Sequence, residues 1–288
     1  MNQSCLSARQ QREVDYHREH AEKHKDILKE PISWEVLREP RRRWWNAYWQ
    51  MVSYLVDSGV QGKRVLVIGC GFGEDALRLA KFGARVSAFD LSPDSLRLAR
   101  ALAEREELVI DFDEMPAEQL RYPDASFDFI LCRDILHHVD IPEAMREIVR
   151  VARPGAQVVI NEIYSHTFTD KVRYSSFVES FLYPRMRSLI YGPGKPYITE
   201  DERKLTEKDL KQIGLFLQPI HFEKHFNLFA TRIFPERMVS LAKLDRLLLM
   251  VFKPFGRLLA GRVLFSARVS KPAVSRDSAP SLQASASG

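Results

Sequence analysis

The chain has 288 residues, enough for one large α/β domain with additions and a core that needs no disulfide or metal. Hydrophobic residues make up 45% and charged residues 28%, which excludes disorder over most of the length. The formal net charge of +5 permits an acidic partner but is small for a dedicated nucleic-acid-binding protein. Three scattered cysteines form neither a disulfide framework nor a zinc pair, so we expect a reducing, cytoplasmic setting.

Residues 1–60 have a polar, helical pattern with an aromatic cluster at 44–49, directly before the first strong strand signal. We expect them to form a helical cap on the core. They contain no apolar run of the kind that a signal peptide requires, so secretion is not expected. The spacing of Tyr16, His17, His20 and His24 brings several of them onto one helix face, but HExxH is absent and no metal site is predicted.

Short β-branched runs alternate with helical stretches from residue 63 to residue 163. The runs are 64–68, 85–89, 108–112, 127–132 and 157–163. This alternation predicts a parallel sheet with helices on both faces, which we place at 61–165. Residues 205–271 are expected to complete the sheet with strands near 217–226 and 262–269 and a helix at 236–259. Residues 272–288 are rich in Ser, Ala and Pro and are predicted to be disordered.

A glycine-rich turn follows the first predicted strand. The sequence VLVIGCGFG at 65–73 indicates a buried strand that runs into Gly69, Gly71 and Gly73, and a helical stretch comes next. Glycine lets the backbone turn sharply and approach a ligand with no side chain between them. Alone, this pattern also fits NAD and FAD sites, and turns that only pack tightly.

The second predicted strand ends at Asp90, and Ser92 and Pro93 then open a helix. A carboxylate at the carboxyl end of such a strand can accept hydrogen bonds from two ribose hydroxyls. The alternative role, capping of the helix, is already supplied by Ser92 or by the proline start. We therefore predict that Asp90 binds the ribose of a nucleoside cofactor.

With these features the chain resembles the class I S-adenosylmethionine methyltransferases, especially the broad group that acts on small molecules. Further matching segments follow in family order: MPAEQL at 115–120, YPDASFD at 122–128, CRDILHHV at 132–139 and VARPGA at 151–156. The resemblance covers about 63–163. It implies an α/β, Rossmann-like fold with a seven-stranded, mostly parallel sheet, helices on both faces, and S-adenosyl-L-methionine as the cofactor.

The resemblance also implies roles for individual residues. Gly69, Gly71 and Gly73 would lie along the methionine and ribose of the cofactor, and Asp90 would bind the ribose hydroxyls. The other residues implied at the cofactor are Leu91 against adenine, Ala117 and Glu118 at the adenine edge, and Cys132 and Arg133 below the methionine. Within the N-terminal cap, Tyr16 is the residue that we place nearest the cofactor.

Two positions depart from the family pattern. Val67 and Pro116 stand where the family usually has acids. Without the acid at 116 the adenine amine loses an acceptor, whose net contribution is about 0.5–1.5 kcal/mol. Glu118, Glu74 and Asp113 are the candidates to replace it.

Methyl transfer from a sulfonium depends mainly on positioning and desolvation. Where the nucleophile is a hydroxyl, a base assists, and histidine suits neutral pH. His137 and His138 follow the strand that ends near Cys132, at the edge where α/β sites form. Glu162, at the end of the fifth strand, is the other candidate base. The alternatives are a packing role for the histidine pair and a solvated carboxylate for Glu162.

Residues 166–204 are predicted to form an insertion that covers the acceptor site. Its candidates for binding a phosphate, carboxylate or sugar are Arg173, Tyr174, Arg185, Arg187 and Tyr191. An ordinary solvated lid is the alternative interpretation.

The stretch 241–253 places leucines, Val251 and Phe252 at helical spacing, with Lys243, Arg246 and Lys253 between them. Such a stripe either packs on the sheet or lies on a membrane surface as a peripheral contact. The longest apolar run, 247–252, is far too short to span a bilayer.

We therefore expect methyl transfer to a small-molecule acceptor or to a lipid- or glycan-linked one. RNA or protein methylation is less favoured, since the sequence has no Asn-Pro-Pro-Tyr-like motif and no concentrated basic domain. A non-catalytic module that binds the cofactor remains an alternative because of Val67 and Pro116. An NAD-dependent oxidoreductase would leave 115–120 and 132–139 unexplained. The acceptor atom and the oligomeric state cannot be predicted from these patterns.

Overall fold

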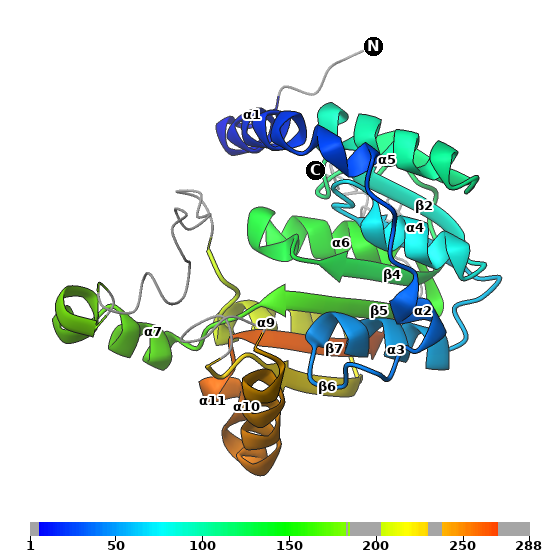
Figure 1. Cartoon of the computed structure of the whole chain (residues 1–288). Coiled ribbons are helices and arrows are strands. Elements are labelled where there is room, and N and C mark those ends of the chain that lie inside the picture. The colour runs from blue at the N-terminus through cyan, green and yellow to red at the C-terminus, as the bar shows by residue number, and fades with distance from the viewer. Residues whose placement is uncertain (1–5, 183, 185–202, 230–237, 270–288) are drawn as a thin grey trace, which may run out of the picture.

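The computed structural model describes residues 6–182, 184, 203–229 and 238–269. Its centre is a seven-stranded sheet with the strand order β3-β2-β1-β4-β5-β7-β6 (Figure 1). The strands are β1 (Arg64–Ile68), β2 (Arg85–Asp90), β3 (Ile110–Glu114), β4 (Phe127–Arg133), β5 (Ala152–Ile163), β6 (Ile220–Phe226) and β7 (Arg262–Arg268). The pairs among β1 to β5 are parallel, and β7 pairs antiparallel with both β5 and β6. The predicted seven-stranded, mostly parallel α/β fold is confirmed.

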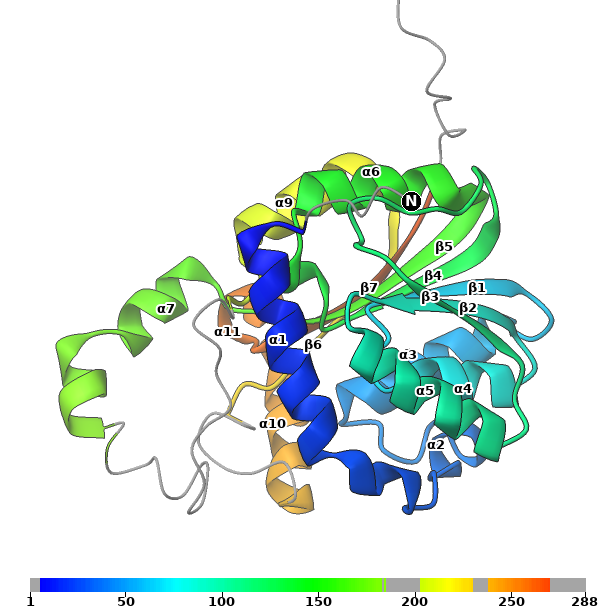
Figure 2. The same cartoon turned by 90° about the horizontal axis from the view of Figure 1, so that it is seen from above.

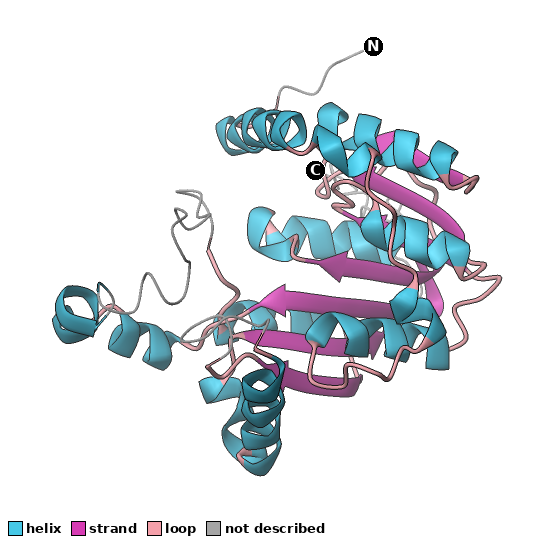
Figure 3. Cartoon of the chain, viewed as in Figure 1, coloured by secondary structure: helices cyan, strands magenta, loops and turns pink. Residues whose placement is uncertain are grey.

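Helices cover both faces of this sheet, as Figures 2 and 3 show. The longer helices are α1 (Ala8–Lys23), α3 (Ala47–Asp57), α4 (Glu74–Lys81), α5 (Pro93–Arg105), α6 (Ile141–Val151), α7 (Thr167–Arg173), α9 (Glu207–Phe216) and α10 (Val239–Val251). The two shortest are α2 (Glu35–Arg38) and α11 (Gly256–Leu259). Helices α3, α4 and α5 lie on one face, and α6 and α9 lie on the other.

The alternation of side chains along β1 explains why both faces are covered. Leu66 and Ile68 pack in the hydrophobic cluster under α6, whereas Val65 and Val67 pack in the cluster under α3 and α4. Successive residues of a strand point to opposite faces, so an uninterrupted apolar run requires a layer of helices on each side. Val67, one of the two departures from the family pattern, is part of the second cluster.

Local capping sets where the helices begin. Ser92 accepts a hydrogen bond from the backbone of Ser95, and Pro93 occupies the first turn of α5, as predicted. Asp140 caps α6 in the same way through the backbone N–H of Glu143. The strand predicted at 108–112 begins later, at Ile110, because the Leu108 N–H still bonds to the end of α5.

The insertion leaves the sheet and returns to it at one point. Tyr164 forms a parallel bridge with Leu205, and Ser165 donates a 2.9 Å hydrogen bond to the Leu205 carbonyl. Between them, α7 and a π-helical turn at Val178–Leu182 project beyond the edge of the sheet (Figure 1). Residues 185–202 and the predicted disordered tail at 272–288 lie outside the described residues.

The helix predicted at 236–259 is shorter than expected. Helix α10 ends at Val251, and a 3-10 turn at Lys253–Phe255 separates it from α11. Pro254 lies in this turn, and proline cannot donate the backbone hydrogen bond that a continuous helix would need.

Candidate active site

The glycine turn lies between β1 and α4. Gly69, Gly71 and Gly73 have φ values of 62°, 52° and 84°, a region that side-chain-bearing residues rarely adopt. A Cβ at Gly69 would lie 2.5 Å from the side chain of Ile135, and one at Gly73 would lie 3.0 Å from Ala99. A Cβ at Gly71 would meet no atom within 4 Å. Gly69 and Gly73 therefore allow close packing, whereas Gly71 borders open space.

Asp90 connects the end of β2 to this turn. Its Oδ2 accepts a 2.8 Å hydrogen bond from the Gly71 N–H, and its Oδ1 accepts a 2.9 Å bond from the Ser92 N–H. The residue is only 8% exposed. A carboxylate has about four acceptor positions, so two stay available after these bonds. The Asp90 carboxylate is thus held in place by backbone and can still accept from a ligand.

A buried pair is formed by His137, in the turn after β4, and Glu162, in the last residues of β5. Glu162 is fully buried, and its Oε1 accepts 2.7 Å hydrogen bonds from the backbone N–H groups of Ile135 and Leu136. Its Oε2 lies 2.8 Å from Nδ1 of His137, which is also buried. The solvated carboxylate considered for Glu162 is therefore excluded, and the three partners hold the turn after β4 in one conformation.

This contact determines the state of the His137 ring. Oε1 of Glu162 already accepts two backbone N–H groups, and with Oε2 accepting as well, Nδ1 of His137 is the donor of this contact. In the neutral imidazole, Nε2 is then the acceptor. Among the described residues, no side chain or backbone group is paired with Nε2. A buried acid that fixes an imidazole in this tautomer is the arrangement that a general base requires.

Helix α1 crosses the carboxyl edge of the sheet, from the turn after β4 to the start of α5 (Figure 2). Arg9 donates a 3.0 Å hydrogen bond to the His137 carbonyl, and Glu13 Oε1 lies 3.0 Å from Nδ1 of His138. Further along the helix, His20 stacks on Phe72 of the glycine turn, with ring centroids 5.3 Å apart. Helix α1 thus covers the glycine turn and the histidine pair together.

The contact between Glu13 and His138 also affects the pKa of Glu13. Burial acts to raise the pKa of Glu13, but the hydrogen bond from His138 and the charges of His138, His17 and Arg9 outweigh it. The pKa of Glu13 is lowered as a result, so this carboxylate stays ionised at neutral pH. Tyr16 lies in the same helix, with its hydroxyl 3.5 Å from Nδ1 of His20.

His20 makes the closure of α1 sensitive to pH. Burial, together with the charges of His24, His17 and Lys23, lowers the pKa of His20 below its usual value of 6.5. A group with a depressed pKa stabilises the closed state above about pH 6.5 and loses that contribution as pH falls through the lowered value. We expect amide hydrogen exchange in α1 to accelerate severalfold on acidification from neutral pH.

The matched variants for this experiment are His20→Phe, which keeps a ring against Phe72, and His221→Phe on the exposed part of β6. His20→Phe is expected to reduce the acid response, and His221→Phe is expected to leave it unchanged. An equal acid response in His20→Phe and in the wild-type chain would contradict this assignment.

The two residues predicted below the methionine point in different directions. Cys132 is fully buried in the hydrophobic cluster under α6. Arg133 instead forms a 2.6 Å ion pair with Asp75 of α4, and its guanidinium lies over the ring of Tyr48. The Asp75 charge raises the pKa of Arg133. Only the backbone of Cys132 can therefore border a ligand, and the Arg133 side chain is engaged on the α4 side.

The predicted adenine-side residues lie at the same edge. Ala117 is buried and Leu91 is half-buried. Glu118 accepts a 3.0 Å hydrogen bond from the Asp140 N–H and a 3.4 Å bond from Gln10 of α1. Its carboxylate thus connects the loop before α6 to the N-terminal helix.

Of the residues predicted in the insertion, Arg173 ends α7 and Tyr174 is exposed beside it. Arg185, Arg187 and Tyr191 lie outside the described residues. Throughout the described ranges, no three His, Cys, Asp or Glu side chains are arranged to hold a metal ion.

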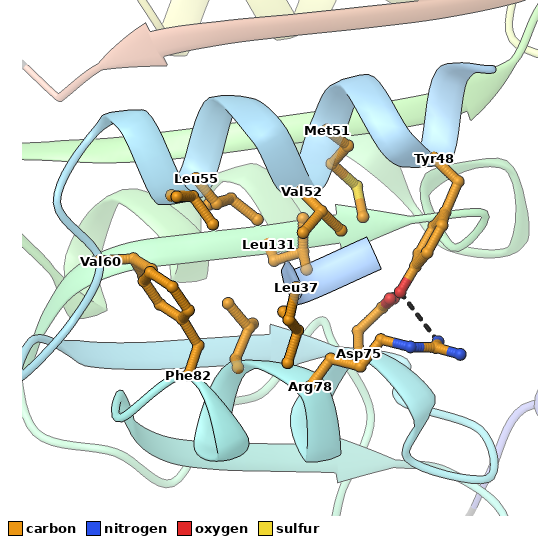
Figure 4. Close-up of a pocket in the computed structure, with 12 residues that line it drawn as sticks. Leu37, Tyr48, Met51, Val52, Leu55, Val60, Asp75, Arg78, Phe82 and Leu131 are labelled. Carbon is orange, nitrogen blue, oxygen red and sulfur yellow. Dashed lines mark hydrogen bonds between the residues drawn. The ribbon is translucent and has the colours of Figure 1, made fainter. Parts of the chain in front are cut away.

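Two cavities lie away from this edge. One, between α3 and α4, has a volume of about 10 Å³, and Tyr48 accepts a 2.9 Å hydrogen bond from Arg78 at one end of it (Figure 4). The other, of about 170 Å³, lies between α9 and the β6–β7 edge. None of the predicted site residues lines either cavity.

Sequence reasoning missed Arg9 and Glu13, which join α1 to the site. They lie four residues apart along the helix, which indicates a shared face but not its partner. The contact of Ile135 with Gly69 could not be predicted either, because apolar residues are common in loops.

A family model described as a methyltransferase domain matches residues 66–160, from β1 to β5. The matched region contains the glycine turn, Asp90 and His137. Residues 66–160 form a methyltransferase domain. The predicted resemblance to methyltransferases is confirmed over these residues.

The chain is 36% identical to norajmaline N-methyltransferase of Rauvolfia serpentina over 114 residues, 38% of this chain and 39% of that protein. It is 35% identical to the ubiquinone biosynthesis O-methyltransferase of Aeromonas salmonicida over 108 residues, 36% of this chain and 45% of that protein. The match thus spans less than half the length of these curated relatives. A solved S-adenosylmethionine-dependent methyltransferase from Mesorhizobium loti has the same fold, with a TM-score of 0.51, 19% identity and coverage of 77% of this chain and 98% of that chain.

Proposed function

We propose that this chain transfers a methyl group from S-adenosyl-L-methionine to a small-molecule acceptor. The observation that carries the proposal is the coupling of Asp90 to the glycine turn. Its carboxylate is fixed by the Gly71 and Ser92 backbone and has acceptor capacity left for the two ribose hydroxyls. This arrangement lies inside the methyltransferase domain, at the carboxyl edge of parallel strands.

The residues at the turn fit this cofactor. Gly71 borders open space, so ligand atoms can approach its backbone directly. Half-buried Leu91 offers apolar surface next to Asp90 for adenine. Pro116 supplies no side-chain acceptor. Glu118 accepts from the Asp140 N–H and Asp113 from Tyr122, and each carboxylate keeps acceptor capacity for a ligand, as Asp90 does. We infer that the backbone near Ala117, with Glu118 beside it, binds the adenine edge.

When bound, the cofactor supplies a sulfonium-activated methyl group. The chain then has to orient the acceptor, exclude water and, for a hydroxyl nucleophile, take up a proton. We assign proton uptake to Nε2 of His137, with Glu162 as the positioning residue that keeps the proton on Nδ1. Helix α1 closes over the glycine turn and the histidine pair and excludes water from this edge.

The relatives support a small-molecule acceptor, because one is named for norajmaline and the other for ubiquinone biosynthesis. One name specifies an N-methyltransferase and the other an O-methyltransferase, so the acceptor atom stays open. Incubation of cell extract with methyl-labelled cofactor tests the class of acceptor. We expect label in the low-molecular-weight or lipid fraction, absent with Asp90→Ala. Label in RNA or protein would favour those substrates, and no transfer to any fraction would favour a non-catalytic module.

A glycine substitution tests where the cofactor binds. Gly71→Ala places a methyl group in the open space beside the turn, whereas Gly155→Ala places one in equally open space at a distant turn. Both glycines have positive φ values, 52° and 79°, so both variants carry a similar backbone strain of about 1–3 kcal/mol. We expect Gly71→Ala to weaken cofactor binding at least about tenfold in calorimetry, which corresponds to about 1.4 kcal/mol.

Gly155→Ala is the matched control and is expected to lower the melting temperature without changing cofactor affinity. If both variants bind the cofactor equally well, the open space at Gly71 does not face the ligand, and the proposed placement is wrong.

A further inference from the structure

The outward face of α10 is apolar. Ala242, Asp245 and Leu249 are buried against the body of the protein. Leu244, Leu247 and Val251, at spacings of three and four residues, lie on the opposite side of the helix, and Val251 is 74% exposed. The exposed apolar surface continues past the helix end. It also includes Met250, Phe252 and Phe255.

Helix α10 lies near the edge of the sheet at which β5 ends. Strand β6 ends at Phe226, which pairs with Arg262, and Arg262 pairs with Ile163 at the end of β5. Helix α10 is attached at that end through Asp245, which accepts a 3.0 Å hydrogen bond from the Leu228 N–H. Figures 1 and 2 show α7 and α10 at the same edge, with α7 reaching further out.

Cations accompany the apolar face. Residues 239–257 contain four cations. Arg257 forms an ion pair with Glu223 of β6, and Arg246 donates a 2.9 Å hydrogen bond to the His225 carbonyl. Lys243 and Lys253 are exposed and pair with no acid in the described part of the chain. An outward face of leucine, valine and phenylalanine with lysine and arginine beside it is typical of helices that lie in the headgroup region of a membrane. In the described part of the chain, no helix is long and apolar enough to cross a bilayer.

We propose that α10 and the turn that follows it bind peripherally to an anionic lipid surface. Charge complementarity favours this occupant over a second copy of the chain. A two-fold interface through the same face would bring Lys243 and Lys253 of both copies together, and like charges across an interface are unfavourable. The proposal does not depend on the methyl-transfer activity.

Sedimentation with vesicles tests the proposal. We expect the wild-type chain to sediment with mixed phosphatidylcholine and phosphatidylglycerol vesicles, and much less with phosphatidylcholine alone or at high salt. Leu247→Gln with Val251→Gln should lower the partition coefficient at least about tenfold, because each side chain contributes apolar burial. Lys253→Gln should lower binding to the anionic vesicles about fivefold.

A matched control exists in the same chain. Val109→Gln with Leu215→Gln removes one valine and one leucine that are 91% and 82% exposed elsewhere, and it should leave sedimentation unchanged. Failure of the wild-type chain to bind either vesicle, or an equal loss in the control, would overturn the proposal. So would a wild-type dimer in analytical ultracentrifugation that Leu247→Gln with Val251→Gln converts to a monomer, because the face would then join two copies.

Discussion

Replacing Asp90 with alanine is expected to lower the affinity for S-adenosyl-L-methionine at least about a hundredfold. Hydrogen bonds to a charged acceptor contribute about 1.5–3 kcal/mol each, and two ribose hydroxyls would lose their acceptor together. The same substitution releases the Gly71 N–H, which Asp90 holds at 2.8 Å. The turn that approaches the ligand therefore loses its attachment to β2 at the same time.

Isothermal titration calorimetry on the folded variant measures this change. Asp90→Asn keeps one oxygen for the backbone contacts and is expected to fall between wild type and Asp90→Ala. Asp111→Ala, an exposed carboxylate on the neighbouring strand β3, is the control and should bind the cofactor normally. Normal affinity in Asp90→Ala would remove Asp90 from the cofactor site.

The sheet could be predicted from the sequence because its strands are short, apolar and separated by strong turn signals. The predicted strand 64–68 coincides with β1, and Asp90 ends β2 as expected. The boundary between α5 and β3 was predicted less accurately than these two strand ends. Val109 is β-branched but 91% exposed, and it belongs to the loop after α5 and not to β3.

The order of the strands predicts which residues of the candidate site lie close together in the core, but it does not predict the contacts of the N-terminal helix. His137 and Glu162 are 25 residues apart. His137 follows β4, and Glu162 lies at the end of the adjacent parallel strand β5, so both are at one edge of the sheet. Their proximity was therefore predictable, whereas the role of Glu162 as the partner of His137 required coordinates. The contact of Glu13 with His138 spans 125 residues and joins the N-terminal cap to the core. No periodicity or motif relates two such segments.

The alternation of side chains along β4 determines the directions in which Cys132 and Arg133 point. Consecutive residues of a strand point to opposite faces, so the two side chains cannot both lie under one ligand. The structure places Cys132 toward α6 and pairs Arg133 with Asp75 of α4. The family motif alone assigns both residues to the ligand. The two-residue repeat of a strand shows that their side chains point to opposite faces of the sheet.

Replacing Glu162 with glutamine is expected to lower kcat about a hundredfold to ten-thousandfold, provided that the acceptor nucleophile is a hydroxyl. Glutamine has the same size, and its carbonyl can still accept from the Ile135 and Leu136 N–H groups. Its amide group, however, donates toward Nδ1 of His137. The imidazole proton then moves to Nε2, and the ring can no longer take a proton from the acceptor.

The pH profile separates this positioning role from a structural one. A general base works only while it can accept a proton, so the wild-type kcat should fall at acidic pH, and Glu162→Gln should lose that dependence as well as rate. His137→Gln should show a similar loss of kcat with little change in cofactor affinity. His138→Gln is the neighbouring control, because it breaks the contact with Glu13 of α1 and should mainly weaken cofactor binding. If Glu162→Gln instead lowered the melting temperature and left kcat and its pH profile intact, Glu162 would only brace the turn after β4, and His137 would not be the base.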